Sequence, residues 1–160
     1  MDRYEYYDVL DPALSNLYGV FWQGQIFTPL TEHSIEKVRL RMFRHGSPGM
    51  VSVSIKETDV DGFPTGADLC SGVTDGNTLP TDYTWKWRDV TLDAPFGLSA
   101  DTKYAIVARA LDGNQDNYVR WRYARPQTYP RGAHVFSGNE GSQWREDTER
   151  DLMFEEWGQA

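Results

Sequence analysis

The chain has very little cysteine: Cys70 is the single cysteine among 160 residues. One thiol cannot form an intrachain disulfide, which excludes the small disulfide-framed folds. Its neighbours Leu69, Ser71 and Gly72 are apolar or small, which favours a buried cysteine over a reactive thiol. At this length we expect a single domain that is held together by a packed core.

The sequence also lacks any apolar run that approaches a membrane span, and it opens with the polar and acidic residues Met1 to Glu5. A transmembrane helix needs about 20 mostly apolar residues. A secretory signal needs a basic start followed by an apolar segment. We therefore expect no membrane insertion, and no signal peptide is visible. We expect a soluble protein that is made in a cytoplasm, is trimmed from a longer chain, or reaches the outside by another route, such as assembly into a virion.

Positive charge is scarce in this chain. The 16 Lys and Arg stand against 24 Asp and Glu, which gives a net charge of −8. A surface of this sign repels nucleic acid and anionic membranes unless basic residues gather locally. We therefore expect no nucleic-acid partner.

Familiar catalytic motifs are missing as well. The three histidines, His33, His45 and His134, are far apart and form neither the HxH nor the HExxH metal spacing. There is no GxSxG elbow, no GxxxxGK[ST] phosphate loop and no GxGxxG fingerprint. A carboxylate pair such as Glu140 and Glu146 could serve a glycosidase, but 24 acidic residues produce many accidental pairs. We expect a protein that is not an enzyme.

What the sequence has in abundance is alternation of apolar and polar residues with a period of two. From Ser34 to Glu57 the alternation is strict on both sides of the turn signal His45-Gly46-Ser47-Pro48-Gly49. Such alternation is typical of strands with one buried and one solvated face. We expect a β-hairpin whose apolar face is covered by a second layer. The expected core residues are Val38, Leu40, Met42, Val51, Val53 and Ile55.

Further strands are expected over much of the remaining chain. Tyr18 to Thr28 and Lys103 to Leu111 carry apolar residues on both faces, which is typical of strands covered on both sides. Asn117 to Tyr123 alternates cleanly, and Leu152 and Phe154 are expected on the core face of the last strand. Eight or nine strands separated by turns, with no helical periodicity, predict an all-β fold: an antiparallel two-sheet β-sandwich of the jelly-roll type.

The first 17 residues, MDRYEYYDVLDPALSNL, fit the strand pattern poorly and are interrupted by Pro12. We interpret residues 1–17 as an N-terminal extension to a single domain that spans residues 18–158. The simpler interpretation is a loose terminus or a strand laid along a sheet edge. The alternative is an arm that docks on a neighbouring subunit.

Two short acidic loops are candidates for a structural calcium ion. Calcium takes six to eight oxygen ligands, and Asp or Asn at alternate positions beside a glycine supplies several of them. Neither loop completes an EF-hand, because position twelve would be Cys70 or Tyr123. Ordinary turns, in which Asp and Asn accept hydrogen bonds from their own backbone, are the competing interpretation. The candidate ligands are Asp59 and Asp61 in one loop, and Asp112, Asn114 and Asp116 in the other.

The chain is rich in aromatic residues, with six Trp, nine Tyr and seven Phe. Flat rings at loops stack on the apolar faces of sugars, while neighbouring polar side chains bond the hydroxyl groups. Trp121 shares the parity of Val119 and is expected in the core. Trp85 and Trp144 border loops and are the better candidates for exposure, although packing under a loop competes with a role in binding for each of them. The candidates for a ligand site are Trp85, Trp87, Trp144, Tyr83 and Tyr129.

Arginines add a second set of candidates. Arg120 and Arg122 alternate with core residues and are expected on an outward strand face beside Tyr118. A guanidinium group binds the carboxylate or sulfate groups of acidic polysaccharides in bidentate fashion. The competing interpretation is pairing with the excess Asp and Glu across strands or across a subunit boundary.

Several stretches together resemble a known module. They are GQIFTP (24–29), the long segment from Val38 to Gly72, WRDVTLDAPFGLSADTKYAIVARA (87–110) and DLMFEEWG (151–158). They resemble a jelly-roll module of phage structural proteins and extracellular microbial proteins, which is similar to non-catalytic carbohydrate-binding modules. The resemblance spans most of residues 18–158 and implies a jelly-roll fold. It fixes no ligand-binding residues.

The expected function is a non-enzymatic, surface-exposed binding or assembly module on a virion or an extracellular structure. Its partner would be a glycan or another protein, and it would form a homo-oligomer or a larger assembly. The alternative is a purely structural subunit, such as a virion decoration or tail protein or a surface-filament subunit, with protein–protein contacts only. The fold does not distinguish the two, because one fold serves many functions.

Overall fold

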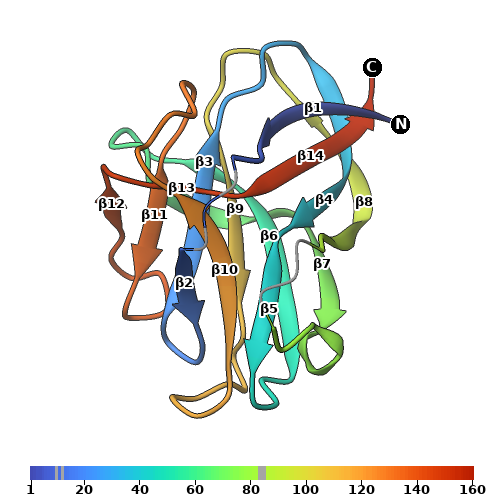
Figure 1. Cartoon of the computed structure of the whole chain (residues 1–160). Coiled ribbons are helices and arrows are strands. Elements are labelled where there is room, and N and C mark those ends of the chain that lie inside the picture. The colour runs from blue at the N-terminus through green and yellow to red at the C-terminus, as the bar shows by residue number, and fades with distance from the viewer. Residues whose placement is uncertain (10, 12, 83–85) are drawn as a thin grey trace.

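The computed structural model describes residues 1–9, 11, 13–82 and 86–160 (Figure 1). No α-helix occurs among these residues; they form 14 strands and one short 3₁₀ turn. In chain order the elements are β1 (Asp2–Tyr7), β2 (Leu14–Leu17), β3 (Trp22–Phe27), β4 (His33–Leu40), β5 (Met42–His45), β6 (Met50–Thr58), β7 (Pro64–Asp75), η1 (Gly76–Thr78), β8 (Arg88–Leu98), β9 (Tyr104–Arg109), β10 (Tyr118–Ala124), β11 (His134–Ser137), β12 (Arg145–Asp147), β13 (Asp151–Leu152) and β14 (Phe154–Gln159).

The strands form two layers that pack face to face. One layer is a six-stranded sheet with the order β12-β11-β3-β9-β6-β7. The facing layer combines the four-stranded sheet β1-β14-β4-β8 with β10, which pairs with β2, β5 and β13. Every strand pair is antiparallel, and the chain crosses between the layers at most connections. The predicted antiparallel β-sandwich is therefore confirmed.

The strand number differs from the expected eight or nine for a physical reason. The long strand after Glu32 is divided at Arg41, and the last strand is divided at Met153. At both residues the pairing partner changes: β4 and β14 pair with each other, whereas β5 and β13 pair with β10. The backbone N–H of Arg122 donates to the Arg41 carbonyl at 2.9 Å, and the N–H of Met153 donates to the Arg122 carbonyl at 2.8 Å. Short strands that carry little alternation, such as β2 and β12, supply the rest.

The main core lies between the two layers. The six predicted core residues of β4, β5 and β6 are all buried in it, as are Leu152 and Phe154. Trp121 is completely buried there, and its indole N–H donates to the Met153 carbonyl at 2.8 Å. Cys70 is also buried, which raises the pKa of its thiol to about 12 and keeps the thiol protonated and unreactive.

The predicted hairpin between Ser34 and Glu57 is wrong in its pairing. β4 pairs with β14 and β8, and β5 pairs with β10, whereas β6 pairs with β7 and β9 in the other layer. The two halves of this segment therefore face each other across the core instead of lying side by side. Period-two alternation describes which face is buried, and it is the same in both arrangements.

A second, smaller apolar cluster lies on the outer face of the six-stranded sheet. Its buried members are Ile26 of β3, Ala105 and Val107 of β9, and Val135 of β11. Half-buried rings of Trp22, Phe63 and Trp144 pack against it. This cluster confirms that the β3 and β9 segments are covered on both faces.

The described part of the first 17 residues lies along the chain's own sheets. β1 pairs with β14, and β2 pairs with β10, so the two termini lie close together (Figure 1). The carboxylate of Glu5 is buried, accepts a hydrogen bond from the Tyr129 hydroxyl at 2.9 Å, and pairs with Arg131. The geometry corresponds to a strand laid along a sheet edge. Among the described residues, no helix is long and apolar enough to cross a membrane.

A buried contact between β4 and β14 lies beside β1. The Nε2 of His33 lies 2.5 Å from Oε1 of Glu156, and its Nδ1 lies 2.8 Å from the Thr31 carbonyl oxygen. Both ring nitrogens of His33 are therefore within hydrogen-bonding distance of an oxygen atom. Burial lowers the pKa of His33, but its hydrogen bonds outweigh burial and the pKa is raised overall. The Tyr4 ring of β1 stacks on His33 at 3.7 Å between centroids.

Candidate functional site

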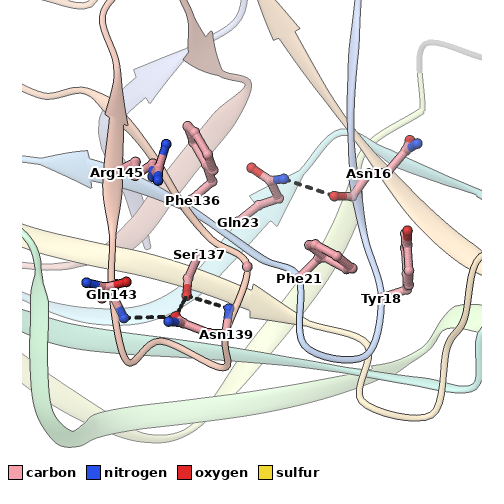
Figure 2. A pocket seen from close by; sticks show the side chains of 10 residues that line it. Asn16, Tyr18, Phe21, Gln23, Phe136, Ser137, Asn139, Gln143 and Arg145 are labelled. Atoms are coloured by element: carbon pink, nitrogen blue, oxygen red, sulfur yellow. Dashed lines mark hydrogen bonds between the residues drawn. The ribbon is translucent and has the colours of Figure 1, made fainter.

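The candidate site is an open hollow of about 470 Å³ at one edge of the sandwich, where β2 and β3 face β11 and β12 (Figure 2). We call it the edge hollow. Three of its lining residues are aromatic, four carry a side-chain amide, and one is an arginine. The residues that line it are Asn16, Tyr18, Phe21, Gln23, Phe136, Ser137, Gly138, Asn139, Gln143 and Arg145.

A tight turn between β2 and β3 brings two of the rings together. The N–H of Tyr18 donates to the Phe21 carbonyl at 3.1 Å, and the N–H of Phe21 donates to the Tyr18 carbonyl at 2.9 Å. Gly19 has φ +53°, a left-handed conformation that glycine adopts without strain. The ring centroids of Tyr18 and Phe21 lie 5.0 Å apart, and Phe21 is 43% exposed. The turn thus displays a large apolar ring to solvent.

The amide of Gln23 is held in one orientation in the floor of the hollow. Its Nε2 donates to the Asn16 carbonyl at 2.9 Å, while its Oε1 lies 2.6 Å from Nε2 of His134. His134 is buried, and burial lowers the pKa of its imidazole, although Asp147 opposes this effect. The fixed His134 ring and the β2 backbone together keep the Gln23 side chain in position.

The loop between β11 and β12 forms a rigid rim. The Ser137 hydroxyl donates to Oδ1 of Asn139 at 2.9 Å and accepts from the N–H of Gly141 at 2.9 Å. The same Asn139 oxygen accepts from the N–H of Gln143 at 2.9 Å. The N–H of Glu140 donates to the Val20 carbonyl at 3.0 Å, which ties the rim to the β2–β3 turn. Figure 2 shows these side chains around the hollow.

The hollow has the chemistry of a site for a neutral or anionic polar ligand with apolar faces. Aromatic rings bind such faces, and amides donate and accept hydrogen bonds with hydroxyl groups. None of the described lining residues is acidic, although the chain contains 24 Asp and Glu. The Ser137 hydroxyl donates to an amide oxygen, so in this arrangement it has no base to activate it.

The sequence-predicted aromatic residues do not gather in the edge hollow. Trp144 is half-buried and lines a second hollow of about 380 Å³ beside Phe63. Trp87 is half-buried against the main core, with the Arg41 guanidinium 4.6 Å from its ring centroid. Tyr129 is only 5% exposed, because its ring packs on Phe154 and its hydroxyl is bonded to Glu5. Tyr83 and Trp85 lie outside the described residues.

The predicted arginines lie on β10, and neither reaches the edge hollow. Arg120 is half-buried and donates to the Tyr118 hydroxyl at 2.7 Å. Arg122 is fully buried, so its expected outward position is wrong. On this face of β10, Arg122 donates to the Asp11 carbonyl at 2.7 Å. Alternation alone does not show when another segment covers a strand face.

The two acidic loops form ordinary turns. Oδ1 of Asp59 accepts from the N–H of Asp61 at 2.9 Å and from that of Phe63 at 3.0 Å. Oδ1 of Asn114 accepts from the N–H of Asp116 at 2.9 Å, in the loop that also contains Asp112. Within the described part of the chain, no group of three or more His, Cys, Asp or Glu residues could hold a metal ion. Structural calcium stays a prediction.

Sequence analysis did not identify the residues of the edge hollow. Its two halves, around residues 16–23 and 136–145, are far apart in the chain and meet because β3 pairs with β11. One signal was present: Phe21 and Gln23 share a parity, which places an aromatic ring and an amide on one strand face.

No protein-family model matches this sequence, and a search of curated proteins finds no significant relative. The resemblance to a carbohydrate-binding-like jelly-roll module therefore stays an expectation.

Proposed function

We propose that this protein is a non-enzymatic binding module that holds a saccharide in the edge hollow. The observation that carries this proposal is Phe21, which is 43% exposed at the mouth of a hollow it shares with Tyr18 and Phe136. Phe is among the residue types that are most often buried in folded proteins. A ligand with an apolar face would cover this one.

The polar lining favours a saccharide over a purely apolar ligand. A sugar ring presents C–H groups on its faces and hydroxyl groups around its edge, and it therefore needs both rings and hydrogen-bonding groups. Here the rings are accompanied by the amides of Asn16, Gln23 and Gln143. The volume of about 470 Å³ falls within the range of about 300–1,000 Å³ that is usual for ligand sites.

The fixed geometry of the hollow also supports binding. The Gln23 amide and the Asn139 rim are held by internal hydrogen bonds before any ligand arrives. A preorganised site loses less conformational entropy when it binds. The hollow is open at the edge of the sandwich, which suits a ligand presented on a larger polymer.

Replacement of Phe21 by Ala tests this proposal. Phe21 is exposed, so we expect the melting temperature to change little, while retention on polysaccharides in affinity electrophoresis weakens about ten-fold or more. The matched control is Leu30→Ala, which removes an exposed apolar side chain (61% exposed) outside the hollow. Unchanged retention of Phe21→Ala, or an equal loss in both variants, would contradict the assignment.

The setting of this module is a separate proposal. We place it on a virion or an extracellular structure, where a glycan or a partner protein is met at the surface. Assembly into a homo-oligomer and the alternative of a purely structural subunit both stay predictions, which the mass of the protein in solution tests.

A further inference from the structure

Arg145 differs from most arginines of this chain because its side chain has no hydrogen-bonding or acidic partner among the described residues. Arg3, Arg39, Arg109 and Arg131 each form an ion pair with an acidic side chain. The side chain of Arg145 is exposed on β12 and forms no hydrogen bond or ion pair with any residue that the structure describes. Its guanidinium is available to a ligand.

The position of Arg145 places this guanidinium at the edge hollow. Arg145 lies opposite Phe136 in the β11–β12 pair and lines the hollow together with Gln143 (Figure 2). Because no described lining residue is acidic, an anionic group that enters meets a cation and amide N–H groups but no carboxylate. Guanidinium groups bind carboxylate and sulfate through paired, charge-assisted hydrogen bonds.

Arg145 also stands where two hollows meet. The hollow beside Trp144 and Phe63, of about 380 Å³, is lined by the same Gln143 and Arg145. A saccharide chain that leaves the edge hollow across β12 would pass this guanidinium and reach a second pair of rings. An anionic group in the middle of such a chain would lie beside Arg145.

We propose that the ligand is an acidic saccharide whose carboxylate or sulfate group is bound by Arg145 while a neighbouring sugar ring rests on Phe21. This inference rests on the proposed function and narrows its ligand class. The net charge of −8 repels a polyanion at a distance. At physiological salt this repulsion is screened beyond about 8 Å, so Arg145 and the lack of an acidic residue in the described lining of the edge hollow decide binding there.

The first experiment compares each acidic polymer with its neutral form by affinity electrophoresis. The probes are polygalacturonate beside its carboxyl-reduced form, and dextran sulfate beside dextran. We expect retention by an acidic polymer and about ten-fold weaker retention by its neutral partner, because one charge-assisted contact is lost. The retained polymer tells carboxylate from sulfate. Equal retention by the neutral form overturns this inference and leaves the proposed function standing. No retention by any of the four polymers overturns both.

The second experiment uses two matched variants. Arg145→Gln removes the guanidinium from the hollow, and Arg125→Gln removes the same charge from an exposed residue that lines neither hollow. We expect about ten-fold weaker retention for Arg145→Gln and unchanged retention for Arg125→Gln, with both melting temperatures unchanged. Equal weakening in both variants overturns the role of Arg145. Binding of poly-L-glutamate as tight as that of the acidic polymer overturns the assignment to a saccharide.

Discussion

At the scale of single residues, the structure differs from the burial expected from the sequence chiefly in charged side chains that are buried. Asp151 is fully buried in β13, where its carboxylate accepts hydrogen bonds from the Gln25 amide at 3.0 Å and the Tyr129 N–H at 2.8 Å. Burial raises the pKa of Asp151 to about 6, although these hydrogen bonds oppose the shift. The folded protein therefore binds this proton more tightly than the unfolded chain does.

This shift predicts how stability changes with pH. Asp151 contributes to the free energy of unfolding. This contribution is fully present below about pH 4, the pKa of Asp in the unfolded chain, and it is lost as the pH rises through about 6. A rise of about two pKa units corresponds to about 3 kcal/mol in the free energy of unfolding. The side chain in Asp151→Asn cannot titrate. The free energy of unfolding of the wild type, minus that of Asp151→Asn, is therefore expected to fall by about this amount between pH 4 and pH 7.

Urea unfolding at several pH values measures this difference. Asp112→Asn is the control, because Asp112 is exposed and its replacement leaves the buried group in place. Parallel pH curves for the wild type and Asp151→Asn would show that Asp151 does not titrate as described.

Single residues also show where sequence-based prediction reaches its limit. Trp121 and Val53 were correctly placed in the core, because apolar residues at alternate positions of a strand share the face that is buried. Arg122 was expected on an outward strand face and Tyr129 was a candidate for the ligand site, yet both are buried, with bonds to Asp11 and Glu5 respectively. Alternation assigns a residue to a strand face, but it carries no information on which distant segment covers that face.

At the scale of elements, most strands from β3 onward were predictable, whereas β1, β2, β12 and the pairing of the strands were not. The turn at residues 45–49 is compatible with a hairpin and with a crossing between layers. Because both arrangements bury the same side chains of β4 and β6, the sequence pattern could not distinguish them. The choice depends on β10, β14 and β9, which supply the actual partners.

The N-terminal strand gives a prediction at this scale. Deletion of residues 1–9 removes Glu5, which accepts hydrogen bonds from the Tyr129 hydroxyl and from Arg131. It also removes the buried Tyr7. We expect the free energy of unfolding to fall by several kcal/mol, because buried polar groups lose their partner and apolar surface is exposed. Thermal melting of the truncated chain measures the loss.

The control for the deletion is Asp2→Ala, which alters an exposed residue of the same strand and is expected to leave the melting temperature unchanged. A truncated chain that melts like the full one would show that β1 is dispensable for the fold. That result would favour the alternative of an arm that acts on a neighbouring subunit.

At the scale of the whole molecule, the fold class followed from the sequence while the candidate site did not. A chain with many short alternating strands and no helical periodicity can adopt few architectures other than a sandwich or a barrel. The edge hollow depends on long-range pairing: Gln23 meets Phe136 only through the β3–β11 register. No local motif marks such a site, since its rings and amides come from separate segments.

The most direct test of the central claim is a two-dimensional amide NMR titration of the intact protein. The ligands are saturated oligomers of galacturonate, with neutral galactose oligomers as the comparison. We predict shifts concentrated in the β2–β3 turn, β11 and the 138–145 segment, with side-chain amide shifts at Gln23 and Gln143. Shifts concentrated in the sheet β1-β14-β4-β8, which lines neither hollow, or no shifts with either ligand, would contradict the proposed site.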